Sequence, residues 1–264
     1  MDLKLAGRSA LITGGSKGIG FGIAKWLAGE GCHVALVARH KEALEQAAAD
    51  ISRSGTAGDG VNVRALAADV GDAAQRRRVV QQCGRVDILV NSAGGIPGGN
   101  LQDVDEAQWR AAWDAKVYGH INMCREFLPL MKEKKSGVII NVIGVGGERL
   151  DAQYIAGATG NAALMAFTRA LGSNSLDHGV RVVGVNPGPV ATERLEFLGR
   201  KRALDRFGDP ERWREFQKNM PLGRPATVDE VAAMVVFLCS PHCSYMSGTI
   251  VTIDGGMANR ATLP

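Results

Sequence analysis

The chain has 264 residues, 45% of them hydrophobic, and a formal net charge of +4, as in an ordinary globular protein. Its basic runs, 74–80 and 198–207, are interleaved with acidic or apolar residues. This pattern is typical of solvated helix faces and argues against a nucleic-acid-binding surface. No apolar run reaches the roughly 18 residues that a membrane span needs, so we expect neither a membrane nor nucleic acid as a partner.

The first 15 residues contain an acid at position 2 and only a short apolar run, which is unlike a secretion signal. An odd, scattered set of five cysteines favours free thiols in a reducing cytoplasm over a disulfide framework. These cysteines are Cys32, Cys83, Cys124, Cys239 and Cys243. The run 239–243 (CSPHC) has no second ligand pair at zinc spacing, so we expect no metal.

Apolar runs rich in Val and Ile recur along the chain without polar alternation, as expected of strands buried on both faces of a parallel sheet. They cover residues 9–13, 33–38, 63–69, 86–91, 137–143, 180–186 and 248–254. Segments with helical spacing lie between them, among them 20–31, 41–55, 104–131, 157–177 and 226–240.

This alternation of strands and helices predicts right-handed βαβ crossovers and a doubly wound α/β sheet of about seven strands. No repeat, linker or low-complexity segment interrupts the order. We therefore expect residues 1–264 to form one domain.

The glycine-rich run TGGSKGIG (13–20) directly follows the first predicted strand and opens the first helix. Glycines at such a junction let the backbone turn tightly and approach a pyrophosphate, which binds at the helix N-terminus. The position of the run in the first βαβ unit favours a Rossmann-type dinucleotide site over a merely structural glycine turn.

The chain resembles the short-chain dehydrogenase/reductase family from end to end. TGGSKGIG matches the family's TGxxxGxG loop, and NSAG (91–94) resembles its NNAG motif with Ser92 in place of the second Asn. NPGPVAT (186–192) resembles its PG motif, and 221–256 resembles its last helix and strand. The resemblance implies that the cofactor contacts Gly14, Ser16, Lys17, Gly18, Ile19, Gly20, Arg39, Asp69, Val70, Asn91, Ala93, Gly94, Pro187, Gly188, Val190 and Thr192.

Charge near the adenosine ribose distinguishes NAD from NADP, because an acid at the end of the second strand would repel a 2′-phosphate. That position is Ala38, followed by Arg39, and Lys17 lies in the glycine loop. Two cations without an acid favour NADP(H), bound at least ~10-fold more tightly than NAD(H). The alternative is that both cations only decorate the surface.

The family's catalytic Ser, Tyr and Lys, and an Asn on the preceding long helix, are not found at the matching positions. With the flanks 141–144 and 161–171 aligned to the family, these positions hold Gly144, Gly157, Asn161 and, for the Asn, Lys116. The resemblance therefore implies the fold and the cofactor but not the usual mechanism.

The lysine and the asparagine have exchanged places, with Lys116 at the Asn position and Asn161 at the Lys position. In the family fold the two positions face each other through water. Our hypothesis is that the Lys116 ammonium replaces the lost cation near the nicotinamide ribose and lowers the pKa of a neighbouring proton donor. The alternative is an ordinary helix lysine that reaches solvent.

Among the three tyrosines, Tyr154 is the candidate proton donor or substrate-binding residue. It precedes Gly157 by roughly one helical turn, whereas Tyr118 lies on the other side of its helix from Lys116. We expect Tyr245 to pack. The alternative for Tyr154 is a packed loop aromatic.

Two acids of the same loop, Glu148 and Asp151, are weaker candidates for proton transfer.

In the family, the segment corresponding to 193–220 closes over the substrate. Here it interleaves arginines and a lysine with leucines and phenylalanines. This pattern suits an apolar substrate with an anionic end, such as an acyl thioester, although a solvated surface helix is an open alternative. Trp213 and Phe216 are candidates to cover the pocket.

The sequence thus favours an NADP-dependent short-chain oxidoreductase that reduces a ketone or 3-oxoacyl carbonyl through a non-standard proton relay with Lys116, Tyr154 and Asn161. The alternative is a non-catalytic NADP(H)-binding protein that acts as a sensor or assembly partner. The resemblance also implies a homotetramer or homodimer built on the helices 104–131 and 157–177.

Overall fold

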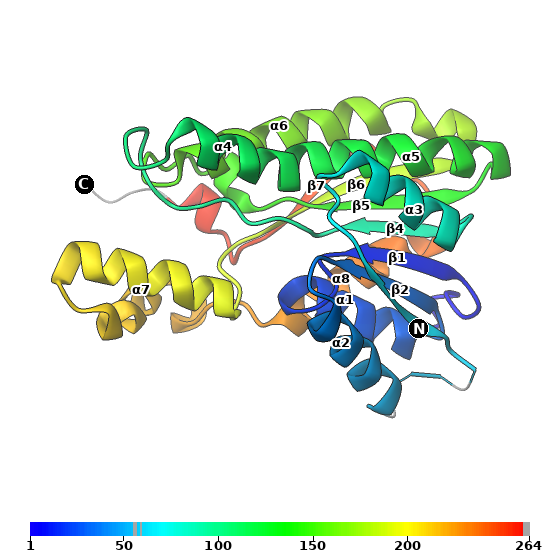
Figure 1. Ribbon diagram of the computed structural model, residues 1–264, viewed down its shortest axis with the longest axis horizontal. Coiled ribbons are helices and arrows are strands. Elements are labelled where there is room, and N and C mark those ends of the chain that lie inside the picture. Colours follow the sequence, from blue (N-terminus) through cyan, green and yellow to red (C-terminus); the bar gives the residue numbers. More distant parts are fainter. Residues whose placement is uncertain (55–56, 59, 261–264) are drawn as a thin grey trace.

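A computed structural model describes residues 1–260 except 55, 56 and 59, and it confirms the predicted sheet. Seven parallel strands pair in the order β3-β2-β1-β4-β5-β6-β7 (Figure 1). The strands are β1 Ser9–Thr13, β2 His33–Ala38, β3 Val63–Ala67, β4 Ile88–Asn91, β5 Gly137–Val142, β6 Val180–Pro187 and β7 Thr249–Ile253. The order reverses between β1 and β4, as in a doubly wound Rossmann-type fold.

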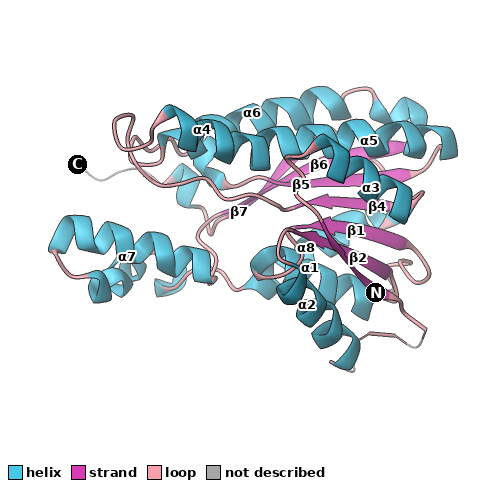
Figure 2. Cartoon of the chain, in the orientation of Figure 1, coloured by secondary structure: helices cyan, strands magenta, loops and turns pink. Residues whose placement is uncertain are grey.

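Helices cover both faces of the sheet, with α1, α2 and α8 on one side and α3 to α6 on the other (Figure 2). They are α1 Gly18–Gly29, α2 Lys41–Arg53, α3 Ala73–Cys83, α4 Glu106–Trp113, α5 Gly119–Lys134, α6 Ile155–Gly172, α7 Glu193–Phe207 and α8 Val228–Cys239. The segment predicted to be helical over 41–55 ends at Gly55, which lies outside the described residues.

Successive residues of β1 enter different layers of the core, which explains the absence of polar alternation. Leu11 packs in the cluster that contains Phe127 of α5, whereas Ile12 packs in the cluster that contains Ile23 of α1. Both strand residues are fully buried. The sheet is therefore apolar on both faces, as the Val- and Ile-rich runs predict.

The helix predicted over 104–131 is not continuous. A π-helical turn, Asp114–Tyr118, separates α4 from α5 and contains Lys116. Such turns carry an extra residue per turn, which changes the direction of the side chains that follow, and they are frequent at functional sites. The spacing of apolar residues in the sequence does not show that this helix contains one extra residue in a turn.

The helix predicted over 157–177 is also shifted, because α6 covers Ile155–Gly172 and a short 3-10 turn, Ser175–His178, follows it.

Two side chains differ from their expected environment. Arg76, in a basic run interpreted as a solvated helix face, is buried, and its guanidinium donates to the Val70 carbonyl at 2.7 Å. Tyr245, expected to pack, is 95% exposed.

Within the described part of the chain, no helix has the length and apolarity needed to cross a membrane. Nor do three His, Cys, Asp or Glu side chains gather there as metal ligands would.

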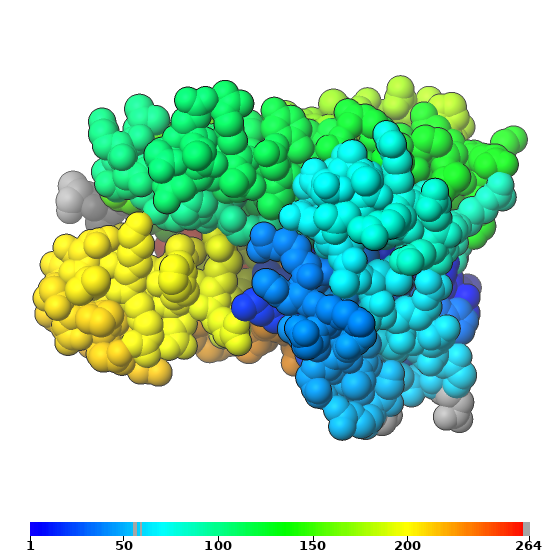
Figure 3. Space-filling model, viewed as in Figure 1, coloured from blue at the N-terminus to red at the C-terminus, as the bar shows by residue number. Residues whose placement is uncertain are grey.

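The segment predicted to cover the substrate site, 193–220, folds as α7 followed by a 3-10 segment, Pro210–Asn219. It projects beside the carboxyl ends of the strands and forms a separate lobe in the space-filling view (yellow in Figure 3). Phe207 and Phe216 stack at 5.5 Å between ring centroids and join its two parts.

Candidate active site

A cleft of about 2350 Å³ opens at the carboxyl ends of the strands. The segments that follow β1, β2, β3, β4, β5 and β6 line it, and α7 forms its outer wall. In open parallel sheets, ligands bind at this edge near the point where strand order reverses. Here that point lies between β1 and β4.

The glycine loop brings main chain against main chain. A Cβ atom on Gly14 would lie 2.8 Å from the Ser92 carbonyl oxygen, and one on Gly20 would lie 2.3 Å from that of Gly14. Lys17 precedes α1 without a side-chain cap, and the first turn of the helix contains no acid. The unpaired N–H groups of this helix end lie at the cleft and suit a dinucleotide's pyrophosphate.

Nearly all the residues expected to bind the cofactor line this cleft. They are Gly14, Ser16, Lys17, Gly18, Ile19, Gly20, Arg39, Asp69, Val70, Ala93, Gly94, Pro187, Gly188, Val190 and Thr192. Asn91 is the exception, because it does not line the cleft. It ends β4 opposite Asn141 of β5, is fully buried, and donates to the Asn141 side-chain oxygen at 2.9 Å.

The charges at the adenosine end differ from the prediction in one respect. Arg39 lines the cleft, is exposed, and has no carboxylate partner among the described residues. Lys17, in contrast, forms an ion pair with Glu193 at 2.8 Å. Glu193 lies at the start of α7 and was not among the charges considered in the sequence-based prediction. Both side chains are mostly exposed, so the pair is weak.

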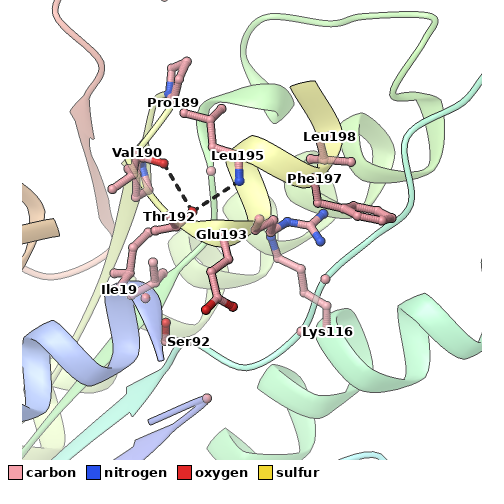
Figure 4. Close-up of a pocket in the computed structure, with 18 of the residues that line it drawn as sticks. Ile19, Ser92, Lys116, Pro189, Val190, Thr192, Glu193, Leu195, Phe197 and Leu198 are labelled. Carbon is pink, nitrogen blue, oxygen red and sulfur yellow. Dashed lines mark hydrogen bonds between the residues drawn. The ribbon is translucent and has the colours of Figure 1, made fainter. Parts of the chain in front are cut away.

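Thr192 holds the N-terminus of α7 at the cleft. Its hydroxyl donates to the Val190 carbonyl at 3.2 Å and accepts from the Leu195 N–H at 3.4 Å (Figure 4). This cap satisfies one of the unpaired donors of the helix.

Lys116 enters the cleft from the side opposite Ile19 and Thr192 (Figure 4). The side chain is buried, and its ammonium donates to the Ile143 carbonyl at 2.6 Å. Burial, followed by the charge of Arg194, lowers the pKa of Lys116 to about 7. The ammonium therefore does not lie in bulk water.

The ring of Tyr154 packs against Gly157. A Cβ atom on Gly157 would lie 2.0 Å from Cζ of Tyr154, the ring carbon that carries the hydroxyl. Tyr154 is half-buried and lines the cleft. A larger side chain at position 157 would therefore occupy the space that the Tyr154 ring fills.

Asn161 lies between Tyr154 and the end of β5. It is 2% exposed, and its side-chain oxygen has no hydrogen-bond partner among the described residues. Its amide nitrogen lies 3.2 Å from where a Gly144 Cβ would be, and Gly144 has a φ of +129°. That conformation strongly favours glycine. The buried oxygen can therefore accept a hydrogen bond from a water molecule or a ligand hydroxyl.

The two acids that are weaker candidates for proton transfer differ in their position relative to the cleft. Asp151 lines the cleft and accepts from the Gln153 N–H at 2.8 Å. Glu148 does not line it, and accepts from the Asn186 side chain at 2.9 Å.

Of the two aromatic residues expected to cover the pocket, Phe216 lines the cleft. Trp213 is buried against Gly199 and does not line it.

His120, one turn after Lys116, is not among the residues predicted from the sequence. It is buried, and its Nε2 lies 3.1 Å from the Ala93 carbonyl. Burial, and then the Lys116 charge, lower its pKa to about 3, so His120 is neutral at pH 7 and supports the Ala93–Gly94 backbone. Its spacing of four residues from Lys116 on one helix was the available signal.

Comparison with known proteins agrees with this architecture. Residues 14–258 match the family described as Enoyl-(Acyl carrier protein) reductase. The chain is 36% identical to Oxidoreductase UcpA of Salmonella typhimurium, over 99% of this chain and 97% of that protein. It is 31% identical to the 3-oxoacyl-[acyl-carrier-protein] reductase FabG of Chlamydia muridarum, over 98% and 100%.

A solved structure of L-sorbose reductase from Gluconobacter frateurii, complexed with NADPH and L-sorbose, superimposes with a TM-score of 0.88. It is 30% identical and covers 99% of this chain and 100% of that chain. The fold, the glycine loop and these full-length matches agree. The chain therefore belongs to the short-chain dehydrogenase/reductase family of oxidoreductases.

Proposed function

We propose that this protein is an NADP-dependent oxidoreductase that reduces the carbonyl group of a ketone or 3-oxoacyl substrate. Bound NADPH would supply the hydride. The cleft has the uncapped helix end and close glycine backbone that a pyrophosphate needs. Relatives named for ketose and 3-oxoacyl reduction support this substrate class.

The preference for NADP(H) over NAD(H) rests on Arg39. Its guanidinium follows β2 without a carboxylate partner in the described chain, and no acid ends that strand. Lys17 is a second cation, but it must leave Glu193 to contact a phosphate. We therefore assign most of the 2′-phosphate recognition to Arg39.

The proposed proton relay is atypical for the family, and one observation carries it. The Lys116 ammonium is buried in the cleft on the Ile143 carbonyl, instead of extending into solvent. From there it can bond a ribose hydroxyl and stabilise a phenolate. Tyr154, whose ring packs on Gly157, would donate the proton to the carbonyl oxygen. Asn161 would hold a bridging water with its unpaired oxygen.

The outer wall also fits a substrate-covering role for residues 193–220. Phe197, Leu198 and Phe216 line the cleft from this lobe and would exclude water from the reacting carbonyl.

The test is to follow NADPH absorbance with a panel of ketones and 3-oxoacyl thioesters. We expect turnover that falls at least ~100-fold in both Lys116→Ala and Tyr154→Phe, the usual scale for loss of a proton-transfer group. Tyr245→Phe is the control, because Tyr245 is 95% exposed and does not line the cleft. Micromolar NADPH binding without turnover of any compound would instead support a non-catalytic sensor or assembly partner.

We also propose a homotetramer or homodimer formed through α4, α5 and α6, which lie together on one outer face (Figure 2). A groove of about 540 Å³ on this side is lined by Leu101, Trp109, Trp113 and Tyr118. Leu101 and Tyr118 are exposed, whereas Trp109 and Trp113 are half-buried. Apolar and aromatic side chains that line a surface groove are typical of interfaces. Light scattering on the eluting protein measures the mass, and a monomer at micromolar concentration would contradict the proposal.

A further inference from the structure

Two cations that the family resemblance did not connect share the substrate side of the cleft. Lys116 reaches it from the π-helical turn, and Arg194 reaches it from the first turn of α7. The Arg194 Nη2 donates to the Ile96 carbonyl in the loop after β4. Its Nη1 has no hydrogen-bond partner among the described residues.

Two consecutive glycines of that loop make room for these two side chains. A Cβ atom on Gly94 would lie 2.5 Å from Cβ of Lys116, and one on Gly95 would lie 2.5 Å from Nη1 of Arg194. Gly94 has a φ of +109°, which favours glycine. The Lys116 side chain therefore packs against Gly94, and the Arg194 guanidinium packs against Gly95.

No carboxylate of the described chain neutralises either cation. The acids that line the cleft already have other partners. Asp69 accepts from Gly71, Asp151 from Gln153, Glu193 from Lys17, Glu215 from Arg212 and Asp229 from Trp26. Two neighbouring cations without a counter-charge are unfavourable, and an anionic ligand would relieve their repulsion.

We infer that Arg194 binds an anionic group of the substrate, a carboxylate or a phosphate close to the carbonyl that is reduced. This inference rests on the proposed function. The free guanidinium nitrogen supplies a charge-assisted hydrogen bond, and the Ile96 carbonyl holds the guanidinium in place. Arg194 is thus proposed as a specificity-determining residue.

The test compares matched carbonyl compounds at saturating NADPH. One arm uses 4-oxopentanoate and its methyl ester, and the other uses dihydroxyacetone phosphate and dihydroxyacetone, which separates a carboxylate from a phosphate. We expect kcat/KM to be ~10- to 100-fold higher for the anion in one arm, the scale of a hydrogen bond to a charged group. Arg194→Gln should remove this preference, because it raises KM for the anion much more than KM for the neutral compound.

Arg200→Gln is the matched control and should keep the preference. Arg200 lies on the same helix but pairs with Glu196 and Glu211 and does not line the cleft. Gly95→Ala is a second test that leaves every charge in place. Its added methyl displaces the guanidinium end, so the preference should fall. Equal kcat/KM for anion and neutral partner in both arms, or a preference that survives Arg194→Gln, overturns the inference.

A binding measurement separates this inference from the proposed function. Calorimetry follows 4-oxopentanoate and dihydroxyacetone phosphate binding to the NADP⁺-loaded protein and to its Arg194→Gln variant. If no carbonyl is reduced but one anion binds through Arg194, the anion site stands and the proposed reaction fails. If neither anion binds to the wild type, the anion site is wrong.

Discussion

In the half of the cleft that follows β1, glycines bring backbone against backbone, whereas in the half that follows β4 and β5 they make room for side chains. Gly14 and Gly20 approach the main chain of Ser92 and of Gly14 itself. Gly94 and Gly157 instead lie against the side chains of Lys116 and Tyr154. The first kind of packing leaves a helix end open to a pyrophosphate.

We propose that the second kind of packing relocates functional groups. In the alignment predicted from the sequence, the family's positions for Ser and Tyr are Gly144 and Gly157. The Asn161 side chain lies beside Gly144, and the Tyr154 ring lies beside Gly157. A glycine at a catalytic position is therefore not evidence of lost chemistry by itself. The neighbours that it admits decide what the site can do.

Replacing Lys116 should have the largest effect and tests the relocated half of the cleft directly. Lys116→Met removes the only ammonium that the described chain buries there, so kcat for carbonyl reduction should fall by ~10²–10⁴. The Kd for NADPH should change far less, because phosphate contacts lie in the other half. Stopped-flow absorbance measures the first and fluorescence titration the second.

Lys132→Met is the matched control, since Lys132 lies on α5 and does not line the cleft. Equal kcat in Lys116→Met and Lys132→Met would contradict a role for Lys116.

The pH dependence of stability provides an independent test of Lys116. Its pKa is lowered to about 7 in the folded protein by burial and Arg194, from 10.5. Between these values the unfolded chain binds more protons, so this lysine makes stability rise with pH. Below pH 7 Lys116 is charged in both the folded and the unfolded protein. The full free-energy cost of burying that charge then lowers the stability of the folded protein. Neighbouring His120, with a folded-state pKa of about 3, is neutral in the folded protein at pH 6 and above. Its protonation in the unfolded chain is common to wild type and variant and cancels in their comparison.

Urea denaturation at pH 6 and pH 10 should therefore show that Lys116→Met gains stability over the wild type mainly at pH 6. The gain should shrink on the order of 3 kcal/mol by pH 10. A stability difference that is the same at both pH values would show that the folded-state pKa of Lys116 is unshifted.

In the other half of the cleft, Arg39→Ala should weaken NADPH binding by ~10- to 100-fold and leave NADH binding unchanged, because only the 2′-phosphate distinguishes the two. Lys41→Ala is the control, since this nearby cation pairs with Glu45 and does not line the cleft. An equal loss for NADPH and NADH in Arg39→Ala would assign Arg39 to another part of the dinucleotide.

The smallest effect is expected where the two halves meet. Glu193→Gln breaks an ion pair whose side chains are 75% and 80% exposed and frees Lys17 for a phosphate. NADPH affinity should rise by ~2- to 5-fold at low salt, and the gain should vanish at 1 M salt. A salt-independent change would point to a rearrangement of α7 instead of a released charge.

The sequence predicted the sheet, and it predicted residues that line the half of the cleft after β1, because both depend on local patterns. Runs such as 9–13 and 180–186 are apolar on both faces, and the glycine loop follows a strand directly. The sequence also singles out Lys116 and Tyr154, and both line the cleft.

Long-range contacts limited the rest. The π-helical turn at Lys116, the Lys17–Glu193 pair and the Arg194 contact with Ile96 join residues through packing that no spacing reveals. Asn91 was assigned to the cofactor from a motif, yet its amide faces Asn141 across the sheet.

The central claim is that an ammonium and a phenol reach the nicotinamide from new positions in the chain. A crystal structure of the NADP⁺ complex tests it most directly. We predict that Lys116 Nζ lies within ~3 Å of a nicotinamide-ribose hydroxyl and that the Tyr154 hydroxyl faces the substrate space at the nicotinamide C4. An ammonium still held only by the Ile143 carbonyl, with the Tyr154 hydroxyl turned away from the ring, would contradict the account.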